Sequence, residues 1–421
     1  MSRMNIAQRD EVRRLFQYPL LEAIAHRRSR RFPQGCALEN DVLQQTSKLP
    51  PLPLSDVEHA VLCWSGIGLT GSITGDLPVS AFGSAFGSWQ GRATPYPCNV
   101  HNTRLFFTND DGVFFHFPKK ITKQVEVKTE DDGDRIMESF EQGRLRVSAQ
   151  RVEFLPKALL GAMHWNTNKP GTTVFMPVVD QSEEYIDFLL ALFSGEGYRI
   201  FDDLKQQPAG LEKWIAQKAI KGPQVLLKSF EFNLMLGNLA PAYLMLENMH
   251  LVAEAMGLGS VMFSGYVGVV MLGGTSLSKG LGFRFTNDKN GQVNPVGLDG
   301  IFEGYCPPYY HTMADAVDAI VEKKFGSQGC FSAGYGGIVP FKQWEKIQPE
   351  FVQPSPKAIS MVKDYCTYVY ETYGRFPATT DTMILPVWLQ VHHLDIDFYE
   401  KYMIKELLTE THRRHNELWH K

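Results

Sequence analysis

The sequence predicts an α+β protein in which short strands and hairpins are interspersed with helices. Helices with recognisable start and stop signals lie at 55–64, 241–256 and 356–373, and the strand-like runs between them do not alternate regularly with helices. The G-x-G-x-x-G fingerprint is absent from the strand-to-helix turns where a dinucleotide-binding unit needs it, and no G-x-x-x-x-G-K-S/T phosphate loop is present. A doubly wound parallel sheet is therefore disfavoured.

Three local signals mark elements in the first part of the chain. Pro19 begins a short helix that ends in an arginine-rich run. Ser55 and Glu58 form a capping box at the start of the next helix. Asp111-Gly112, a tight-turn signal between two aromatic-rich runs, predicts a β-hairpin over 104–117. The apolar face of the first of these helices consists of three side chains: Leu20, Leu21 and Ile24.

Later segments continue the mixed pattern. Residues 120–150 are rich in charge and are expected to be exposed. Pro241 in its first turn and Gly257 at its end bound the clearest helix of the chain. The remaining predicted elements are strands at 172–179, 260–263, 281–285 and 295–298, and helices at 183–192, 313–325 and 356–373.

Composition excludes several classes of function. The 421 residues include 42 basic and 46 acidic side chains, a net charge of −4 that disfavours nucleic-acid binding. The six cysteines form no Cys-x-x-Cys pair and are expected to be reduced thiols in the cytoplasm. The N-terminus lacks the apolar run of a signal peptide. The uncharged stretch 255–278 contains six glycines, which favours passage through a protein core over a membrane helix.

The run Arg27-Arg28-Ser29-Arg30-Arg31 is the strongest candidate for a ligand site. Guanidinium groups bind phosphate through paired, charge-assisted hydrogen bonds. A phosphomonoester carries about −1.5 to −2 charge near pH 7, so two or three arginines match it. The same run also fits an ordinary helix end, where the helix dipole favours each arginine by roughly 0.3–1 kcal/mol. Taken alone, the run leaves both interpretations open.

Three segments, in order, resemble the FMN-dependent nitroreductase superfamily. AIAHRRSRRF, residues 23–32, resembles the opening signature in which an Arg-Arg-Ser-x-Arg run holds the phosphate and ribityl chain of FMN. GRATPYPCNVHNTRLFF, residues 91–107, resembles the R-x-x-P-S-x-G-x-x-P loop before a strand, especially in the azoline-oxidase branch. ENMHLVAEAMGLGSVMFSGY, residues 247–266, resembles the family's helix-to-strand segment. The order of these segments favours a phosphate site over a simple helix end.

The resemblance implies a fold and a division of the chain. The fold is a nitroreductase-like mixed, mainly antiparallel sheet flanked by helices, with a large insertion and a C-terminal extension. The implied division is 1–124 as the first part of an FMN-binding core, 125–239 as an insertion and possible substrate lid, 240–304 as the second part of the core, and 305–421 as a helical extension.

Carried over residue by residue, the resemblance also implies a flavin site. Arginines and the serine of the run bind the phosphate and ribityl oxygens, Asn99 faces the edge of the isoalloxazine ring, and Ser264 and Gly265 make backbone contacts near its reactive nitrogen. Arg375 is the candidate for the late basic residue that completes the phosphate site. The departures are Tyr96, Pro97 and Cys98 in place of small residues, and Ser264 in place of an acidic one. The implied FMN-binding set is Arg27, Arg28, Ser29, Arg31, Asn99, Ser264, Gly265 and Arg375.

The resulting hypothesis is an FMN-dependent oxidoreductase that transfers hydride or electrons through flavin N5 to or from a small organic substrate. Family members are homodimers with flavin at the interface, so the charged, amphipathic first 15 residues are expected to pack on a partner, and NAD(P)H is a compatible donor.

A flavin-storage protein without turnover is the alternative. A metal-dependent hydrolase built on 392–395 is more remote, because adjacent histidines point apart and no third ligand is spaced for one ion, so no metal site is expected. Neither the substrate nor a catalytic residue follows from the sequence.

Overall fold

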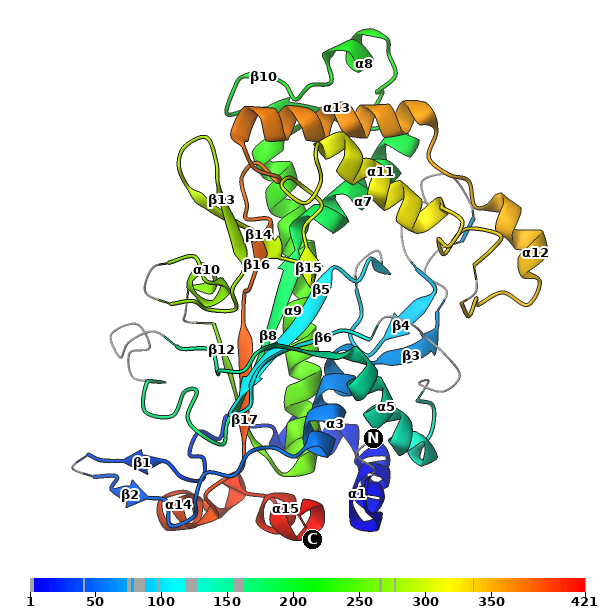
Figure 1. Ribbon diagram of the computed structural model, residues 1–421. Coiled ribbons are helices and arrows are strands. Elements are labelled where there is room, and N and C mark those ends of the chain that lie inside the picture. Colours follow the sequence, from blue (N-terminus) through cyan, green and yellow to red (C-terminus); the bar gives the residue numbers. More distant parts are fainter. Residues whose placement is uncertain are drawn as a thin grey trace.

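The structure of the protein is a computed structural model. The structure describes residues 4–40, 42–73, 77–78, 88–96, 99–118, 127–154, 163–264, 267–275, 278–335 and 337–420. Helices and strands are mixed along the chain, which confirms the predicted α+β class (Figure 1).

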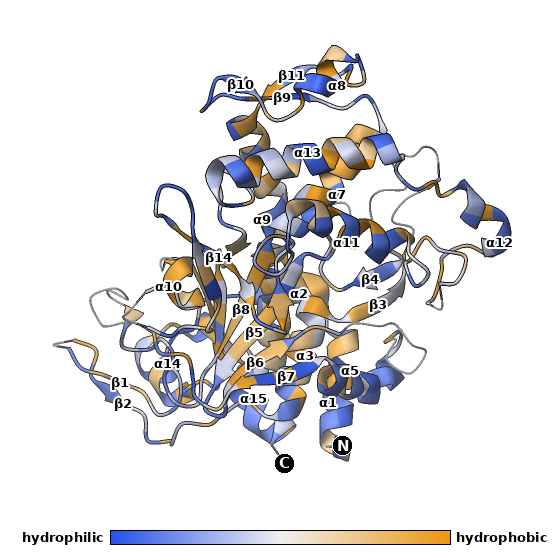
Figure 2. Cartoon of the chain, turned by 45° about the horizontal axis from the view of Figure 1, so that its top comes forward, coloured by the Kyte–Doolittle hydropathy of each residue, from blue (hydrophilic) through white to orange (hydrophobic). Residues whose placement is uncertain are grey.

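A seven-stranded sheet runs through the middle of the molecule (Figure 1). The order of its strands is β12-β17-β8-β5-β6-β7. The short strand β16 pairs with β8, as β17 does. All of these strand pairs are antiparallel. Figure 2 shows the apolar residues of β5, β6 and β8 gathered at the centre. The strands are β5 (Thr103–Asn109), β6 (Gly112–His116), β7 (Arg144–Ser148), β8 (Thr173–Asp180), β12 (Gly259–Phe263), β16 (Met383–Ile384) and β17 (Trp388–His392).

The central sheet contains strands from each part of the expected division of the chain. Strand β8 comes from the expected insertion, where it lies between β17 and β5 and all eight of its residues are buried. Strand β17 comes from the expected extension and pairs with both β12 and β8. The segment 125–239 therefore contributes a central strand to the sheet, and its role as a substrate lid stays a prediction.

Smaller strands form four additional sheets. They are β1 (Ala37–Leu38) with β2 (Gln45–Thr46); β3 (Leu69–Ser72) with β4 (Gln90–Arg92); β9 (Arg199–Asp202) with β10 (Gln207–Pro208) and β11 (Gln224–Leu226); and β13 (Arg284–Asn287) with β14 (Val293–Leu298) and β15 (Phe302–Glu303).

Helices cover the sheet and extend beyond one end of it. They are α1 (Ile6–Gln17), α2 (Leu20–His26), α3 (Asp56–Ile67), α5 (Gly133–Gly143), α7 (Gln181–Ser194), α8 (Glu212–Ala216), α9 (Leu227–Met256), α10 (Gly268–Leu272), α11 (Met313–Phe325), α12 (Trp344–Ile347), α13 (Pro356–Tyr373), α14 (Ile396–Tyr402) and α15 (Glu410–Trp419). Short 3-10 helices are η2 (Glu130–Asp132), η4 (Gln348–Glu350) and η5 (Lys405–Leu407). None of the described helices is both long and apolar enough to span a bilayer.

Elements with strong local signals lie where they were predicted. The capping box of Ser55 and Glu58 opens α3. Strands β5 and β6 pair around the predicted turn, where Gly112 has φ +131°, a value that L side chains rarely adopt. Helix α13 begins after Ser355, whose side chain accepts the amide of Ala358, and ends at a left-handed Gly374.

Helix α9 is nearly twice as long as predicted. It has 30 residues, and Pro241 lies inside it rather than at its first turn. A proline in a helix interior costs about 3 kcal/mol because it removes one backbone hydrogen bond. Packing offsets this cost, since four side chains that follow the proline are completely buried against the core: Ala242, Met245, Leu246 and Met249.

Two segments rich in charge also contribute side chains to the core. The charged segment 127–150 folds into α5 and β7, and the apolar side of α5 is buried next to α3. The N-terminal arm packs within its own chain, where Met4 and Val12 join the core. By contrast, the apolar face of α2 is uncovered, with Leu20, Leu21 and Ile24 exposed by 65%, 78% and 50%.

Candidate functional site

The arginine run follows helix α2 and is fastened to the start of β12. The backbone amide of Arg30 donates to the carbonyl of Ser260 at 3.2 Å. Its side chain is 2% exposed and pairs with the carboxylate of Glu254 on α9, which is 1% exposed. Arg30 Nε also donates to the carbonyl of Leu407 at 2.6 Å. Arg30 therefore has a structural role in the run, because Glu254 neutralises its charge inside the protein.

The other arginines of the run are more accessible. Arg27 Nε lies 3.1 Å from Glu247 Oε1 on α9, in a half-exposed pair. Arg28 is exposed and donates to the carbonyls of Ala25 and Arg27 at 2.9 and 2.8 Å, which is the helix-end role considered from the sequence. Arg31 is partly buried, with Nη1 2.7 Å from Met163 Sδ.

The charges around the run leave a positive excess. Of the four guanidinium groups of the run, those of Arg27 and Arg30 pair with the carboxylates of Glu247 and Glu254, which leaves two arginines of the run outside these ion pairs. Within the described part of the chain, Arg28 and Arg31 have no acidic partner, and Ser29 between them is exposed. Burial, helped by the charge of Arg27, lowers the pKa of the neighbouring His250 to about 4, so its ring adds no charge at pH 7. This excess matches one phosphate dianion.

Helix α9 brings the three motif segments together. Glu247 binds Arg27 of the first segment, and the adjacent Asn248 donates from Nδ2 to the carbonyl of Ala93 in the second segment at 3.1 Å. Glu247 and Asn248 themselves belong to the third segment. Neither residue was predicted as a site residue from the sequence. The acidic residues at 247 and 254 are seven positions apart on one helix, and this spacing, which places both on one face, could have identified them as partners of the arginine run.

Asn99 is buried, and both ends of its amide are engaged. Its Nδ2 donates to the carbonyl of Ser88 at 2.5 Å, and its Oδ1 accepts from His101 Nε2 at 2.7 Å. The other nitrogen of His101 accepts from Arg92 Nε at 3.3 Å. Burial and the charges of Arg92 and Arg104 hold the pKa of His101 well below its usual value, consistent with a neutral ring. In this arrangement the Asn99 side chain links Ser88 to His101.

The remaining predicted contacts are only partly described. Ser264 follows β12 directly and is exposed. Gly265, Pro97 and Cys98 lie outside the described residues.

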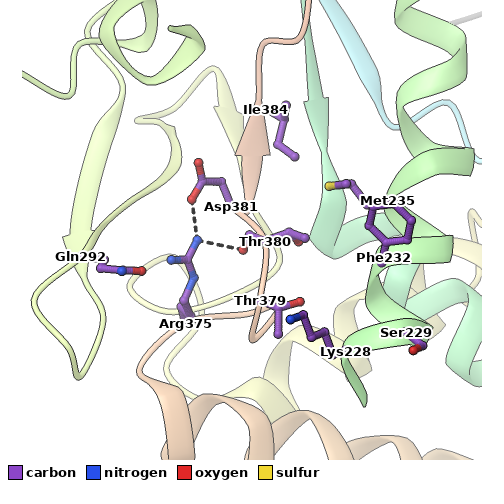
Figure 3. A pocket seen from close by; sticks show the side chains of 10 residues that line it. All are labelled: Lys228, Ser229, Phe232, Met235, Gln292, Arg375, Thr379, Thr380, Asp381 and Ile384. Carbon is purple, nitrogen blue, oxygen red and sulfur yellow. Dashed lines mark hydrogen bonds and ion pairs between the residues drawn. The ribbon is translucent and has the colours of Figure 1, made fainter. Parts of the chain in front are cut away.

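Arg375 lies away from the arginine run. The expectation that it completes the phosphate site with the run is therefore not met within this chain. It lines a cavity of about 640 Å³ beside the first turns of α9, together with Lys228, Phe232 and Met235 (Figure 3). Glu247 is twelve residues beyond Met235, about 18 Å along the helix axis. The guanidinium of Arg375 also faces acidic and polar oxygens, with Asp381 Oδ1 at 2.5 Å, Thr380 O at 2.8 Å and Asp288 Oδ2 at 3.6 Å.

A buried carboxyl lies close to the second motif segment. Asp180 lies at the end of β8, where its backbone amide donates to the carbonyl of Asn102 and its own carbonyl accepts from Asn102 Nδ2. Its side chain caps α7 by accepting the amide of Ser182 at 2.8 Å. Its side chain is completely buried. Burial, with the neighbouring carboxylate of Glu183, raises the pKa of Asp180 to about 7.

Comparisons with known proteins show only a remote likeness. No family model matches the sequence, and no curated protein matches it. Among solved structures, one from Ralstonia eutropha JMP134 described as a "putative nitroreductase" is 13% identical, with a match covering 59% of this chain and 70% of that one, at a TM-score of 0.26. A likeness at that score carries no argument about fold or function.

Proposed function

We propose that this protein is an FMN-dependent oxidoreductase of the nitroreductase-like type, acting on a small organic substrate. The observation that supports the proposal is the convergence of three motif segments on α9, next to a run that keeps two uncompensated arginines. When bound, FMN supplies hydride or electron transfer through its N5 atom. The described cysteines form no disulfide with one another, which fits the proposed cytoplasmic location.

The residues of the run have different roles in this proposal. Arg28, Ser29 and Arg31 bind the phosphate and ribityl oxygens. Arg27 lies at the edge of the site, where Glu247 holds its guanidinium, and Arg30 fixes the run to the core without touching the ligand. Ser264 and Gly265 contribute backbone groups near the ring. The amide of Asn99 faces the ring only after exchanging one of its present hydrogen bonds.

A homodimer is part of the proposal, because apolar side chains of α2, which precedes the run, and of α9 are uncovered. Helices α2 and α9 contact each other. Covering their exposed side chains with a second copy would place the run near an interface. Light scattering of the FMN-loaded protein should give twice the chain mass, and a monomer at micromolar concentration would contradict the dimer. The exposed side chains are Leu20, Leu21 and Ile24 of α2, and Phe232, Leu236, Tyr243 and Leu244 of α9.

Arg28→Ala tests the phosphate site directly. A charge-assisted hydrogen bond to phosphate contributes about 1.5–3 kcal/mol, so FMN affinity should fall roughly tenfold or more. The melting temperature of the apoprotein should change little, because Arg28 is exposed. Flavin fluorescence titration measures the affinity.

Arg9→Ala is the matched control, since Arg9 is an exposed arginine on α1 that pairs with Asp134. It should bind FMN as the unmodified protein does. Failure of the unmodified protein to bind FMN, or equal affinity for Arg28→Ala, would refute the proposal.

Storage of flavin without turnover is the second candidate, favoured by the engaged amide of Asn99. Rapid mixing of the FMN-loaded protein with NADH or NADPH separates the two. Bleaching of the flavin absorbance supports the oxidoreductase. Flavin that stays oxidised with both donors, and with candidate substrates, supports storage.

A further inference from the structure

A second cluster of polar side chains lies away from the arginine run, where the C-terminal helix α15 meets α3. It contains Glu58, His393, His415 and His420, each of which offers one ligand atom within 4.8 Å of all the others. Glu58 Oε1 lies 2.9 Å from His415 Nε2 and 3.3 Å from His420 Nε2. Glu58 Oε2 lies 3.8 Å from His393 Nε2. Residues from three distant parts of the sequence therefore meet at one point.

Both ring nitrogens of His415 lie within hydrogen-bond distance of an acceptor oxygen. Its Nδ1 is 2.7 Å from the carbonyl oxygen of Met256, and its Nε2 is 2.9 Å from the carboxylate of Glu58. Both partners are acceptors, whereas a neutral imidazole carries only one N–H. A cation between Nε2 and Glu58 resolves the conflict, because Nδ1–H then donates to Met256 and the lone pair of Nε2 becomes a ligand. This carbonyl–histidine–metal arrangement is typical of protein metal sites.

His393 supplies a second, independent sign of a ligand. Its side chain is 1% exposed, and its Nε2 has no hydrogen-bond partner among the described residues. A buried nitrogen without a partner is destabilising. Coordination to an ion would supply the missing partner of Nε2.

Glu58 is positioned to act as the carboxylate ligand. Its Oε2 accepts the amide of Ser55 at 2.6 Å and the hydroxyl of Ser55 at 2.8 Å, in the capping box of α3. The cap fixes the carboxylate so that Oε1 faces His415 and His420. Ligating carboxylates are commonly held by such outer hydrogen bonds.

We propose that Glu58, His393, His415 and His420 bind one zinc ion that fastens the C-terminal helix to the core. Three imidazoles and a carboxylate suit Zn²⁺, and ligand atoms in a tetrahedral zinc site lie about 3.3 Å apart. The contacts of Glu58 Oε1 with His415 and His420, at 2.9 and 3.3 Å, are close to that value, and the ligand atoms of all four residues lie within 4.8 Å of one another. Four protein ligands leave no open position, so the site is structural and does not favour a metal-dependent hydrolase.

The proposed site differs from the expectation that the chain holds no metal. The two adjacent histidines do point apart, as expected: His393 faces Glu58, whereas His392 lies against Gly259 and Gln390. The missing ligands come from α3 and from the last residues of the chain. The inference is independent of the proposed flavin function, since none of its four residues belongs to the FMN-binding set.

Zinc binding to the full-length protein tests the proposal. Protein stripped with a chelator and desalted is titrated with Zn²⁺ alone, in competition with a chromogenic chelator, and elemental analysis gives the stoichiometry. One equivalent per chain is expected, together with a higher melting temperature and, with Co²⁺ in place of Zn²⁺, the intense visible absorption of a tetrahedral site.

His420→Gln removes one ligand that is 24% exposed, so its folding should be retained. Its zinc affinity should fall tenfold or more. His412→Gln on the same helix is the control, because His412 faces Glu254 instead of the cluster and the variant should bind like the unmodified protein. Less than one equivalent bound, a strong preference for a different metal, or equal affinity in His420→Gln would overturn the proposal. The last outcome would mean that His420 is not a ligand of the ion.

Discussion

Replacing Glu254 with alanine is expected to lower the free energy of unfolding by about 3–5 kcal/mol, the cost of breaking a buried ion pair on one side. The guanidinium of Arg30 would then remain in the core with no carboxylate, 2% exposed, and hydrogen-bonded to the carbonyls of Leu407 and His26. Urea denaturation followed by tryptophan fluorescence and circular dichroism measures the change.

Glu247→Ala is the matched control on the same helix. The Glu247–Arg27 pair is 42% and 37% exposed, and exposed pairs contribute about 0–1 kcal/mol. A loss for Glu254→Ala as small as that for Glu247→Ala would show that Arg30 finds another partner or water. The double change Arg30→Met with Glu254→Leu should recover much of the lost stability, because no charge stays buried.

The second large effect is a dependence of stability on pH through Asp180. Its pKa is about 7 in the folded protein and 3.8 in a model peptide. Between these values the folded protein holds a proton that the unfolded chain has released, so the free energy of unfolding falls as pH rises from about 4 to about 7. A difference of about three units corresponds to about 4 kcal/mol.

Asp180→Asn should remove this dependence, because the amide resembles the protonated carboxyl and still accepts from Ser182 through Oδ1. The two proteins should be about equally stable near pH 4, which serves as the internal control. By about pH 8 the variant should be more stable by about 3–4 kcal/mol. Parallel stability curves across this range would mean that Asp180 is ionised in the folded protein at neutral pH.

Much of the local structure follows from neighbouring residues alone. The helices predicted at 313–325 and 356–373 have the observed bounds. The capping box at Ser55 and the hairpin turn at Gly112 also lie where they were expected. These features depend on hydrogen bonds and backbone angles within a few residues, so the sequence window that predicts them contains all the groups involved.

The predictions that differ from the structure concern packing between segments distant in the sequence. Pro241 predicted a helix start, but α9 continues through it because both halves of the helix are buried against other elements. The segment 125–239 matched no motif and was therefore taken for an insertion, although β8 lies at the centre of the sheet. Local preferences of about 3 kcal/mol are smaller than the burial of several large side chains, so tertiary contacts decide such cases.

The sequence by itself determined which chemical groups are present: an arginine run suited to phosphate, capped helices and one pair of adjacent histidines. Only the tertiary structure decided which of those groups remain available. It neutralises Arg30 with Glu254 and leaves Arg28 without an acidic partner among the described residues. It also brings Glu58 to His393, which is 335 positions later in the chain. Electrostatic pairing and coordination depend on distances of a few ångströms in space, and a linear sequence does not contain those distances.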